Sequence, residues 1–292
     1  MVRTAEFLID AGGTLSRVVQ WGLSGPAVLF VHGLGSNAGI WRAVAPELAA
    51  KGWRCFAVDA PGHGLSAKSA EFNYSLDGHV HWLGALLDAL ALDAMDVVAS
   101  SLGGLWATGF ATTYPRRVRS LTLIGAVGLA PLPSERRNWT AEYLTRMDRV
   151  SVAGRLRAAV FDPRVVDETM VEEAFRMNNS PGATAAFARL GDYYRSGIND
   201  DMQIERLATV ERDWMLLLIW GCEDTIVPLA HAFDTGRRIP DCTLLALEAT
   251  KHIPHVERPS IVCWALTQQL SGLRLPEGPV DAGQVTRFAV AR

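Results

Sequence analysis

This sequence has no run of apolar residues that approaches the roughly 18 residues a membrane-spanning helix needs. It has no run of five like charges either, and its formal net charge is only −3. The short arginine clusters at 116–119 and 136–137 are interrupted, so we expect solvated helix ends or loops there. These absences exclude a spanning helix and argue against a nucleic-acid partner.

Cysteine is scarce as well, and no two cysteines form a C-x-x-C pair. Each lies in or beside an apolar stretch, so we expect buried free thiols and a reducing compartment. Residues 1–10 contain two acidic residues and no long apolar segment, which does not fit a signal peptide. We therefore expect a soluble, cytoplasmic protein with no membrane partner. The four cysteines are Cys55, Cys222, Cys242 and Cys263.

Apolar residues make up 49% of the 292 positions and charged residues 20%, which is ample for a large core. After an opening hairpin, short apolar runs alternate with longer amphipathic segments. The hairpin is predicted at 6–10 and 15–21, and further strands at 27–31, 53–58, 95–99, 121–124, 215–220 and 243–247. Helices are predicted at 40–50, 76–92, 102–114, 229–238 and 261–270. This alternation predicts an α/β fold, with a mainly parallel sheet and helices on both faces.

The alternation breaks between residues 128 and 207, where strand-like runs give way to helical, arginine-rich and aromatic sequence. We predict a helical insertion at 128–207, hereafter the cap, between two parts of a core at 1–127 and 208–272. Residues 273–292 show no pattern and are expected to form a peripheral tail. An additional short strand at 284–290 is the alternative for that tail.

Residues 99–104 read Ala-Ser-Ser-Leu-Gly-Gly, between a predicted strand and a predicted helix. A strand-to-helix turn of this kind is so tight that the residues two positions before and after its centre must be small. Ala99 and Gly103 meet this requirement for a turn centred on Ser101. A turn centred on Ser100 would place larger side chains there. Ser101 is therefore the predicted nucleophile.

A serine hydroxyl needs a base, a group that orients the base, and donors for the oxyanion. His252 follows the last predicted core strand and is favoured as base over His255, because it lies nearer the strand's carboxyl end. Asp224 follows the preceding strand with Gly-x-x-Asp-x-x-x-Pro spacing and is favoured as the orienting acid. We expect its neighbour Glu223 to face solvent or to cap the next helix.

Backbone amides suit the oxyanion because fixed N–H groups need no reorganisation as charge develops. The glycine-rich segment 31–37 closes the first long strand, and we predict the Leu34 amide as one donor. The Leu102 amide is the second, at the positive end of the following helix. His32 is expected to hold the loop by hydrogen bonds, with proton transfer as the alternative role. Candidate substrate contacts are Gly33, Ser36, Ser100 and Ile253.

No metal or organic cofactor is predicted. Once His252 and Asp224 are assigned, no cluster of metal-ligand type is left. The glycines at 33 and 35 lack the third glycine and the later acid of a dinucleotide-binding loop.

Together these segments resemble the α/β-hydrolase superfamily, in its serine-nucleophile, esterase-like branch with a helical cap. Residues 59–66, Asp-Ala-Pro-Gly-His-Gly-Leu-Ser, resemble the Asp-x-Pro-Gly-x-Gly-x-Ser loop common there, which is usually structural, so His63 is assigned no chemistry. The resemblance covers roughly residues 6–271 and departs at Ala99 and Lys251, where glycine is usual. It implies an α/β-hydrolase fold and a Ser-Asp-His triad in that chain order.

We expect hydrolysis of a small carboxylic ester through an acyl-enzyme. Thioesters and lactones remain alternatives, as does cofactor-free perhydrolysis with the same residues. A further alternative is C–C cleavage of meta-cleavage-product type, because cap residues 161–187 look similar to that subgroup. Three of the subgroup's features are replaced here by Ser100, Ile253 and Glu173-Ala174. A non-catalytic ligand-binding protein is the least favoured alternative, and the oligomeric state and pathway stay open.

Several cap arginines could bind a substrate carboxylate through their guanidinium groups. Their helical spacing beside acidic residues favours a solvated face instead. The cap aromatics suit an apolar acyl or aryl group, although most of them must pack the cap onto the core. The arginines are Arg146, Arg149, Arg155, Arg157, Arg176 and Arg189.

Overall fold

Ten strands form one sheet in the described part of the chain, residues 2–239 and 241–288 of this computed structural model. Their order is β1-β2-β4-β3-β5-β6-β7-β8-β10-β9. The six strands from β4 to β8 in this order run parallel, while the outer strands pair antiparallel. The strands are β1 (Thr4–Asp10), β2 (Leu15–Trp21), β3 (Ala27–Val31), β4 (Arg54–Val58), β5 (Met95–Ser100), β6 (Val118–Ile124), β7 (Met215–Gly221), β8 (Cys242–Leu247), β9 (Gly278–Val280) and β10 (Gly283–Phe288).

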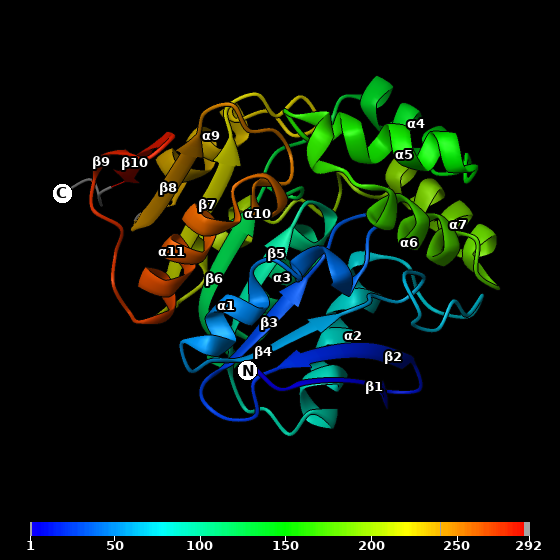
Figure 1. The fold of residues 1–292 in the computed structure, drawn as a ribbon, viewed down its shortest axis with the longest axis horizontal. Coiled ribbons are helices and arrows are strands. Elements are labelled where there is room, and N and C mark those ends of the chain that lie inside the picture. The colour runs from blue at the N-terminus through cyan, green and yellow to red at the C-terminus, as the bar shows by residue number, and fades with distance from the viewer. Residues whose placement is uncertain (1, 240, 289–292) are drawn as a thin grey trace.

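Helices cover both faces of this sheet, and further helices gather beside the ends of its central strands (Figure 1). The α-helices are α1 (Ala45–Ala50), α2 (Leu76–Ala89), α3 (Leu102–Thr113), α4 (Ser134–Tyr143), α5 (Arg149–Ala158), α6 (Glu168–Asn178), α7 (Ala183–Ser196), α8 (Ile204–Thr209), α9 (Ala230–Arg238), α10 (Pro254–Glu257) and α11 (Pro259–Leu270). Three 3₁₀ turns are η1 (Ala38–Trp41), η2 (Pro115–Arg117) and η3 (Pro163–Val165).

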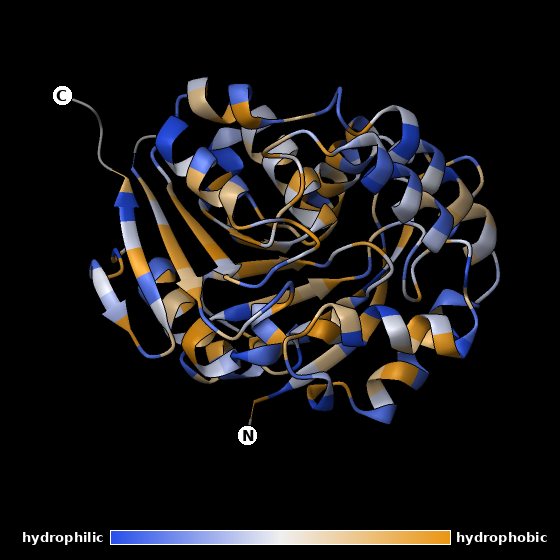
Figure 2. Ribbon diagram, turned by 90° about the horizontal axis from the view of Figure 1, so that it is seen from above, coloured by the Kyte–Doolittle hydropathy of each residue, from blue (hydrophilic) through white to orange (hydrophobic). Residues whose placement is uncertain are grey.

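The apolar strand β3 contributes side chains to the hydrophobic clusters on both faces of the sheet. All of its residues are buried, and successive side chains point to opposite faces. Val28 and Phe30 pack in the cluster that includes α1 and α11. Leu29 and Val31 pack in the cluster that includes α2 and α3. Figure 2 shows these hydrophobic central strands between helices on either side, which is the α/β arrangement predicted from the continuous apolar runs.

The cap segment 128–207, all of it described, contains helices α4 to α7, the first residues of α8, which ends at Thr209, and no strand. α4 packs against α7, and α5 against α6. In Figure 1 these helices lie together at one side of the molecule, above the ends of the parallel strands. The segment therefore adds a helical layer over the edge of the sheet where the strands end.

The prediction of one continuous helix at 40–50 is wrong. The structure has the short 3₁₀ turn η1 and then α1. Asn37 starts the first of these, because its side chain accepts a hydrogen bond from the Gly39 amide. Pro46 lies in the first turn of α1, where its missing N–H costs no helical hydrogen bond. The helix predicted at 76–92 is also shorter than expected, because the chain turns at Ala91 with φ 53°.

The C-terminal segment was expected to be peripheral, and it instead extends the sheet. β10 runs antiparallel to β8, with Gly283 opposite Leu247 and Phe288 opposite Cys242. Val285 on β10 is completely buried, which anchors the strand in the core. The alternative of a strand at 284–290 agrees with β10 as far as residue 288; residues 289 and 290 lie outside the described residues.

All four cysteines are free, and the three at 55, 242 and 263 are buried as expected. Cys222 is exposed, which corrects the expectation for that residue. Its position explains this, because it follows the last residue of β7 and begins a surface turn. Among the described residues, none of the helices has the length and apolar character needed to cross a bilayer.

Candidate active site

Ser101 lies between the end of β5 and the first residue of α3. Its backbone has φ 51° and ψ −123°, a conformation that is costly for a residue with a side chain. Hydrogen bonds with β6, with α3 and with the segment after β6 hold it there. The Ser101 amide donates to the Ile124 carbonyl at 3.0 Å, and its own carbonyl accepts from the Gly104 and Val127 amides at 2.9 Å. The turn thus presents the serine hydroxyl above the carboxyl end of the sheet.

Two glycines allow this turn to approach the loop after β3. A Cβ at Gly33 would lie 2.7 Å from the Ser101 Cβ, and a Cβ at Gly103 would lie 2.4 Å from the His32 carbonyl oxygen. Both distances are too short for real Cβ contacts. Any side chain at these positions would therefore push the serine turn away from the 31–37 loop.

The structure brings Ser101, His252 and Asp224 into one hydrogen-bonded chain. His252 Nε2 accepts from the Ser101 hydroxyl at 2.9 Å, and His252 Nδ1 donates to Asp224 Oδ2 at 2.8 Å. Asp224 Oδ1 accepts from the Ile226 and Val227 amides at 2.8 and 2.9 Å, which fixes the carboxylate. The three residues follow β5, β8 and β7, whose carboxyl ends meet at one edge of the sheet. Both His252 and Asp224 are buried.

The competing histidine, His255, takes no part in this chain of hydrogen bonds. Its ring stacks on Trp41, with 4.3 Å between the ring centroids, and is completely buried. Burial lowers the pKa of His255 to about 3, with a smaller effect from His252. Neither ring nitrogen has a hydrogen-bond partner among the described residues. It therefore packs the α10 region and makes no polar contact with Ser101.

The competing acid, Glu223, does not point freely to solvent or cap the next helix as expected. Its Oε2 accepts from the Thr250 amide at 3.0 Å, and its own amide donates to the Thr250 carbonyl at 3.1 Å. These bonds join the turn after β7 to the loop that carries His252. Glu223 thus supports the two loops that hold the histidine and the acid.

The predicted oxyanion donors are the amides of Leu102, directly after Ser101, and of Leu34, in the loop after β3. Leu102 is the first residue of α3, so its amide has no acceptor within the helix. The Leu34 amide has no acceptor among the described residues, and Leu34 lines the cavity beside Ser101. Both amides are therefore available to an oxygen bound next to the serine.

His32 holds the 31–37 loop by hydrogen bonds, as expected for a structural histidine. Its Nδ1 donates to the Gly33 carbonyl at 2.7 Å, and its Nε2 accepts from the Ala60 amide at 3.0 Å. The ring is fully buried, and desolvation lowers its pKa. A neutral ring with both nitrogens engaged has no free position for proton transfer.

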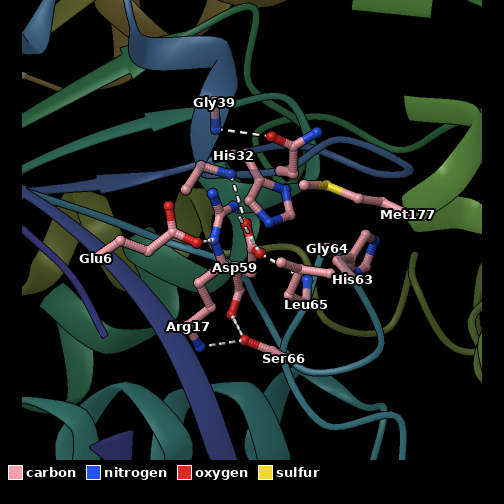
Figure 3. A network of polar contacts seen from close by, with 12 residues as sticks. Glu6, Arg17, His32, Gly39, Asp59, His63, Gly64, Leu65, Ser66 and Met177 are labelled. Atoms are coloured by element: carbon pink, nitrogen blue, oxygen red, sulfur yellow. Dashed lines mark hydrogen bonds and ion pairs between the residues drawn. The ribbon is translucent and has the colours of Figure 1, made fainter. Parts of the chain in front are cut away.

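Asp59 ties the two loops below the cavity together (Figure 3). The fully buried carboxylate accepts from the Ala38 amide at 2.6 Å and from the Leu65 amide at 2.8 Å. It also pairs with Arg17 at 3.2 Å, and Arg17 pairs in turn with Glu6 at 2.7 Å. This network explains why the 59–66 loop is structural, because it supports the segment after β3 without reaching Ser101.

A cavity of about 400 Å³ opens above Ser101 and His252. This volume lies within the range of ~300–1,000 Å³ typical of small-molecule sites. Gly33, Ser36, Ser100 and Ile253, the candidate substrate contacts, all belong to its wall. The cap supplies most of the remaining wall, which is largely apolar and aromatic. These cap residues include Leu132, Trp139, Tyr143, Leu144, Val152 and Leu156.

Three polar residues of the cavity wall were not singled out from the sequence. Arg155 was one of six cap arginines with equal standing, and Arg136 was expected to be merely solvated. Asn178 is buried, and its Nδ2 donates to the Gly35 carbonyl at 3.1 Å. No local spacing separates these residues from their neighbours, because only the packing of the cap selects which side chains face the cavity.

The described residues contain no group of three or more histidines, cysteines or acids that could hold a metal ion. The polar side chains at the site are a hydroxyl, an imidazole and a carboxylate, and hydrogen bonds join each to the next. This arrangement suits nucleophilic attack by serine with histidine as base.

The mostly parallel sheet, the strained turn at Ser101 and the hydrogen-bonded histidine and acid form the arrangement typical of α/β-hydrolase folds. The family model of the alpha/beta hydrolase fold matches residues 26–259. The chain belongs to this family.

Two known proteins and one solved structure show the range of the relatives. The chain is 30% identical over 250 residues to the dihydrolipoyllysine-residue acetyltransferase component of an acetoin cleaving system from Pseudomonas putida, covering 85% of this chain and 64% of that protein's length. It is 28% identical to a 2-hydroxy-6-oxo-2,4-heptadienoate hydrolase of Pseudomonas putida, over 86% of this chain and 91% of that one. The structure of a 2-hydroxy-6-oxo-6-phenylhexa-2,4-dienoate hydrolase from Rhodococcus sp. strain RHA1 superimposes with a TM-score of 0.82 at 22% identity, covering 93% and 100% of the two chains.

Proposed function

We propose that this protein hydrolyses a carboxylic ester of a small molecule through an acyl-enzyme on Ser101. The observation that carries the proposal is the Ser101–His252–Asp224 chain, with distances of 2.9 and 2.8 Å, at the floor of a largely apolar cavity. A serine hydroxyl that is already hydrogen-bonded to an imidazole nitrogen is prepared for deprotonation as it attacks.

In the proposed reaction His252 takes the proton of Ser101 while the serine oxygen attacks the ester carbonyl. The resulting oxyanion accepts hydrogen bonds from the Leu34 and Leu102 amides, and the dipole of α3 adds to this stabilisation. His252 then gives its proton to the departing alcohol. The acyl group stays bound to Ser101 until His252 activates a water that releases the acid.

Asp224 has a supporting role in this scheme. Its Oδ2 accepts from His252 Nδ1 and so keeps the Nε2 lone pair directed at Ser101. The negative carboxylate also stabilises the imidazolium that forms during attack. Because the Ile226 and Val227 amides hold the other oxygen, the carboxylate does not rotate away.

C–C hydrolysis is the second candidate, favoured by the heptadienoate hydrolase that matches most of this chain. Three positions weigh against it. Ser100 and Ile253 stand in the cavity wall where that subgroup has asparagine and tryptophan. At the position aligned with the subgroup's cap arginine stands Glu173, whose carboxylate pairs with Arg42. The subgroup's cap arginine is therefore not reproduced at this position.

A fluorophosphonate probe followed by peptide mass spectrometry tests the nucleophile. We expect labelling of Ser101 in the native protein and in Ser100→Ala, and no labelling in Ser101→Ala. The Ser101→Ala and His252→Ala variants should lose nearly all turnover of p-nitrophenyl esters. Asp224→Asn should lose turnover by a factor on the order of 10⁴.

Retention of more than a tenth of the activity in Ser101→Ala would overturn the assignment of the nucleophile. Labelling without turnover of esters across a range of acyl lengths would favour C–C cleavage, which a 2-hydroxy-6-oxo-dienoate substrate would then test. A folded protein that the probe does not label would favour a ligand-binding role.

A further inference from the structure

Five arginines of the cap pair with acids on the outside of the protein: Arg149, Arg157, Arg164, Arg176 and Arg195. Arg149 contacts Glu168 at 2.6 Å, and Arg176 contacts Glu172 at 2.6 Å. The two arginines in the cavity wall differ from these. Within the described part of the chain, neither Arg136 nor Arg155 forms an ion pair, and the wall contains no aspartate or glutamate. The cavity therefore has two positive charges and no negative side chain of its own.

Arg155 is held in place by groups that leave its charge uncompensated. From α5, its Nη1 donates to the Tyr143 and Arg146 carbonyls at 3.0 and 3.1 Å. The guanidinium lies over the Tyr143 ring, 5.2 Å from the centroid, and Nη2 is 3.5 Å from the Met147 sulfur. Nε and Nη2 thus have no oxygen acceptor among the described residues. A fixed fork with free donors is preorganised for a carboxylate.

The charge of Arg155 is also partly removed from water. Burial lowers the pKa of Arg155, and Tyr143 and Asp148 offset this only in part. The Asp148 carboxylate is engaged elsewhere, because it caps α5 by accepting from the Ser151 amide and hydroxyl at 2.9 and 2.5 Å. A desolvated cation of this kind is stabilised when an anion binds beside it.

Arg136 completes the positive wall from the neighbouring helix α4. Its Nη2 donates to the Thr225 carbonyl at 2.9 Å, in the turn directly after Asp224, and its guanidinium lies 5.5 Å from the centroid of the Trp139 ring. Arg136 therefore bridges the cap and the core at the cavity. The same cavity wall contains the apolar side chains of Leu144, Val152 and Leu156.

We infer that Arg155, assisted by Arg136, binds a carboxylate at the far end of the substrate's acyl chain. The substrate class is then a monoester of an aliphatic α,ω-dicarboxylic acid, whose methylene chain occupies the apolar wall. This inference rests on the proposed serine hydrolase function. The acyl portion is the one assigned to this subsite, because it stays on Ser101 during deacylation and gains most from a fixed position.

The kinetic test compares kcat/KM for pairs of methyl esters. In each pair one ester is monomethyl adipate, suberate or sebacate, and the other has a carboxamide in place of the free carboxylate. The carboxamides match the acids in size and lack only the charge. We expect kcat/KM to favour the acid by roughly 10- to 100-fold at the best chain length, as charge-assisted hydrogen bonds allow. In Arg155→Gln this ratio should fall toward one, and Arg155→Lys should recover part of it. Arg149→Gln, outside the cavity, is the matched control and should keep the native ratio.

A second measurement does not depend on turnover. Monomethyl suberate should bind the Ser101→Ala variant in calorimetry, and adding Arg155→Gln should weaken binding by a similar factor. Native circular dichroism of the Arg155 variants shows that they fold. Equal kcat/KM for acid and carboxamide esters would overturn the inference and leave the serine esterase standing. If no ester is hydrolysed and Ser101 is not labelled, the proposed function fails, and the calorimetry alone then supports or overturns the anion subsite.

Discussion

At the residue scale, two histidines three positions apart have opposite environments. His252 has a hydrogen-bond partner on each ring nitrogen, whereas His255 has none among the described residues and stacks on Trp41. Both rings are buried, so burial alone does not mark the base. Its distinguishing feature is the pair of partners, which come from strands far apart in the sequence.

The buried neutral histidines predict a loss of stability in acid. Burial lowers the pKa of His255 to about 3 and that of His79 to about 4. Unfolded histidine binds a proton near pH ~6.5, so between that pH and these values the unfolded chain holds more protons than the native one. The free energy of unfolding should therefore fall as the pH falls, by up to about 1.4 kcal/mol per pH unit for each histidine.

His255→Phe tests this at one position, because phenylalanine keeps the stacking on Trp41 and cannot bind a proton. In urea unfolding at pH 7 and pH 5, the variant should lose less stability on acidification than the native protein. His81→Gln, at an exposed histidine, is the control and should keep the native difference. An unchanged difference in His255→Phe would show that this ring does not drive the acid sensitivity.

At the scale of elements, α10 joins the loop of His252 to the cap. The Glu257 carboxylate at its end accepts from the Lys251 amide at 2.8 Å and from the Phe161 amide at 2.5 Å. The His252 amide donates to the Ala159 carbonyl at 2.9 Å. These bonds position the histidine from two sides, through the backbone on either side of it.

Glu257→Gln should therefore reduce catalysis more than folding. The amide accepts through one oxygen only, so one of the two backbone N–H groups loses its acceptor and the loop shifts. We expect kcat for a p-nitrophenyl ester to fall roughly tenfold, because small displacements of a catalytic group are costly. KM should change little. Glu248→Gln, at an exposed position at the end of β8, should leave kcat unchanged. A native kcat in Glu257→Gln would mean that the loop is held by other contacts.

At the scale of the whole molecule, β10 covers what would otherwise be the edge of the parallel sheet at β8. A chain that ends at Pro276 would expose this edge and the apolar side chains beneath Val285. We expect the free energy of unfolding to fall by at least about 2 kcal/mol, the contribution of one buried aliphatic side chain. An open edge also favours association between chains.

Urea unfolding and light scattering measure both effects of this truncation. Val285→Asp in the full chain should reproduce much of the loss of stability, because it places a charge in the core. Thr286→Ala, at the next and half-buried position, should have a small effect. A truncated chain that is as stable and as dispersed as the native protein would show that β9 and β10 are dispensable.

The parts of the fold that could be predicted depend on local patterns. Continuous apolar runs predicted the strands, and the small residues around Ser101 predicted the turn after β5. The split of the 40–50 helix was missed because Asn37 and Pro46 act against the apolar periodicity. β10 was missed as a firm element because its single deeply buried residue, Val285, produces a weak pattern.

The sequence by itself determined the α/β architecture and the tight turn at Ser101, because apolar periodicity and tight turns are properties of neighbouring residues. Only the tertiary structure decided which histidine meets the serine, what Glu223 supports, and which cap arginines face the cavity. Those outcomes depend on contacts between residues far apart in the sequence, from 27 positions between Glu223 and Thr250 to 151 positions between Ser101 and His252. Arg149 and Arg155 lie on the same helix, α5, and nothing in the local sequence distinguishes them. In the folded protein Arg155 lines the cavity, whereas Arg149 forms an ion pair with Glu168 on the surface.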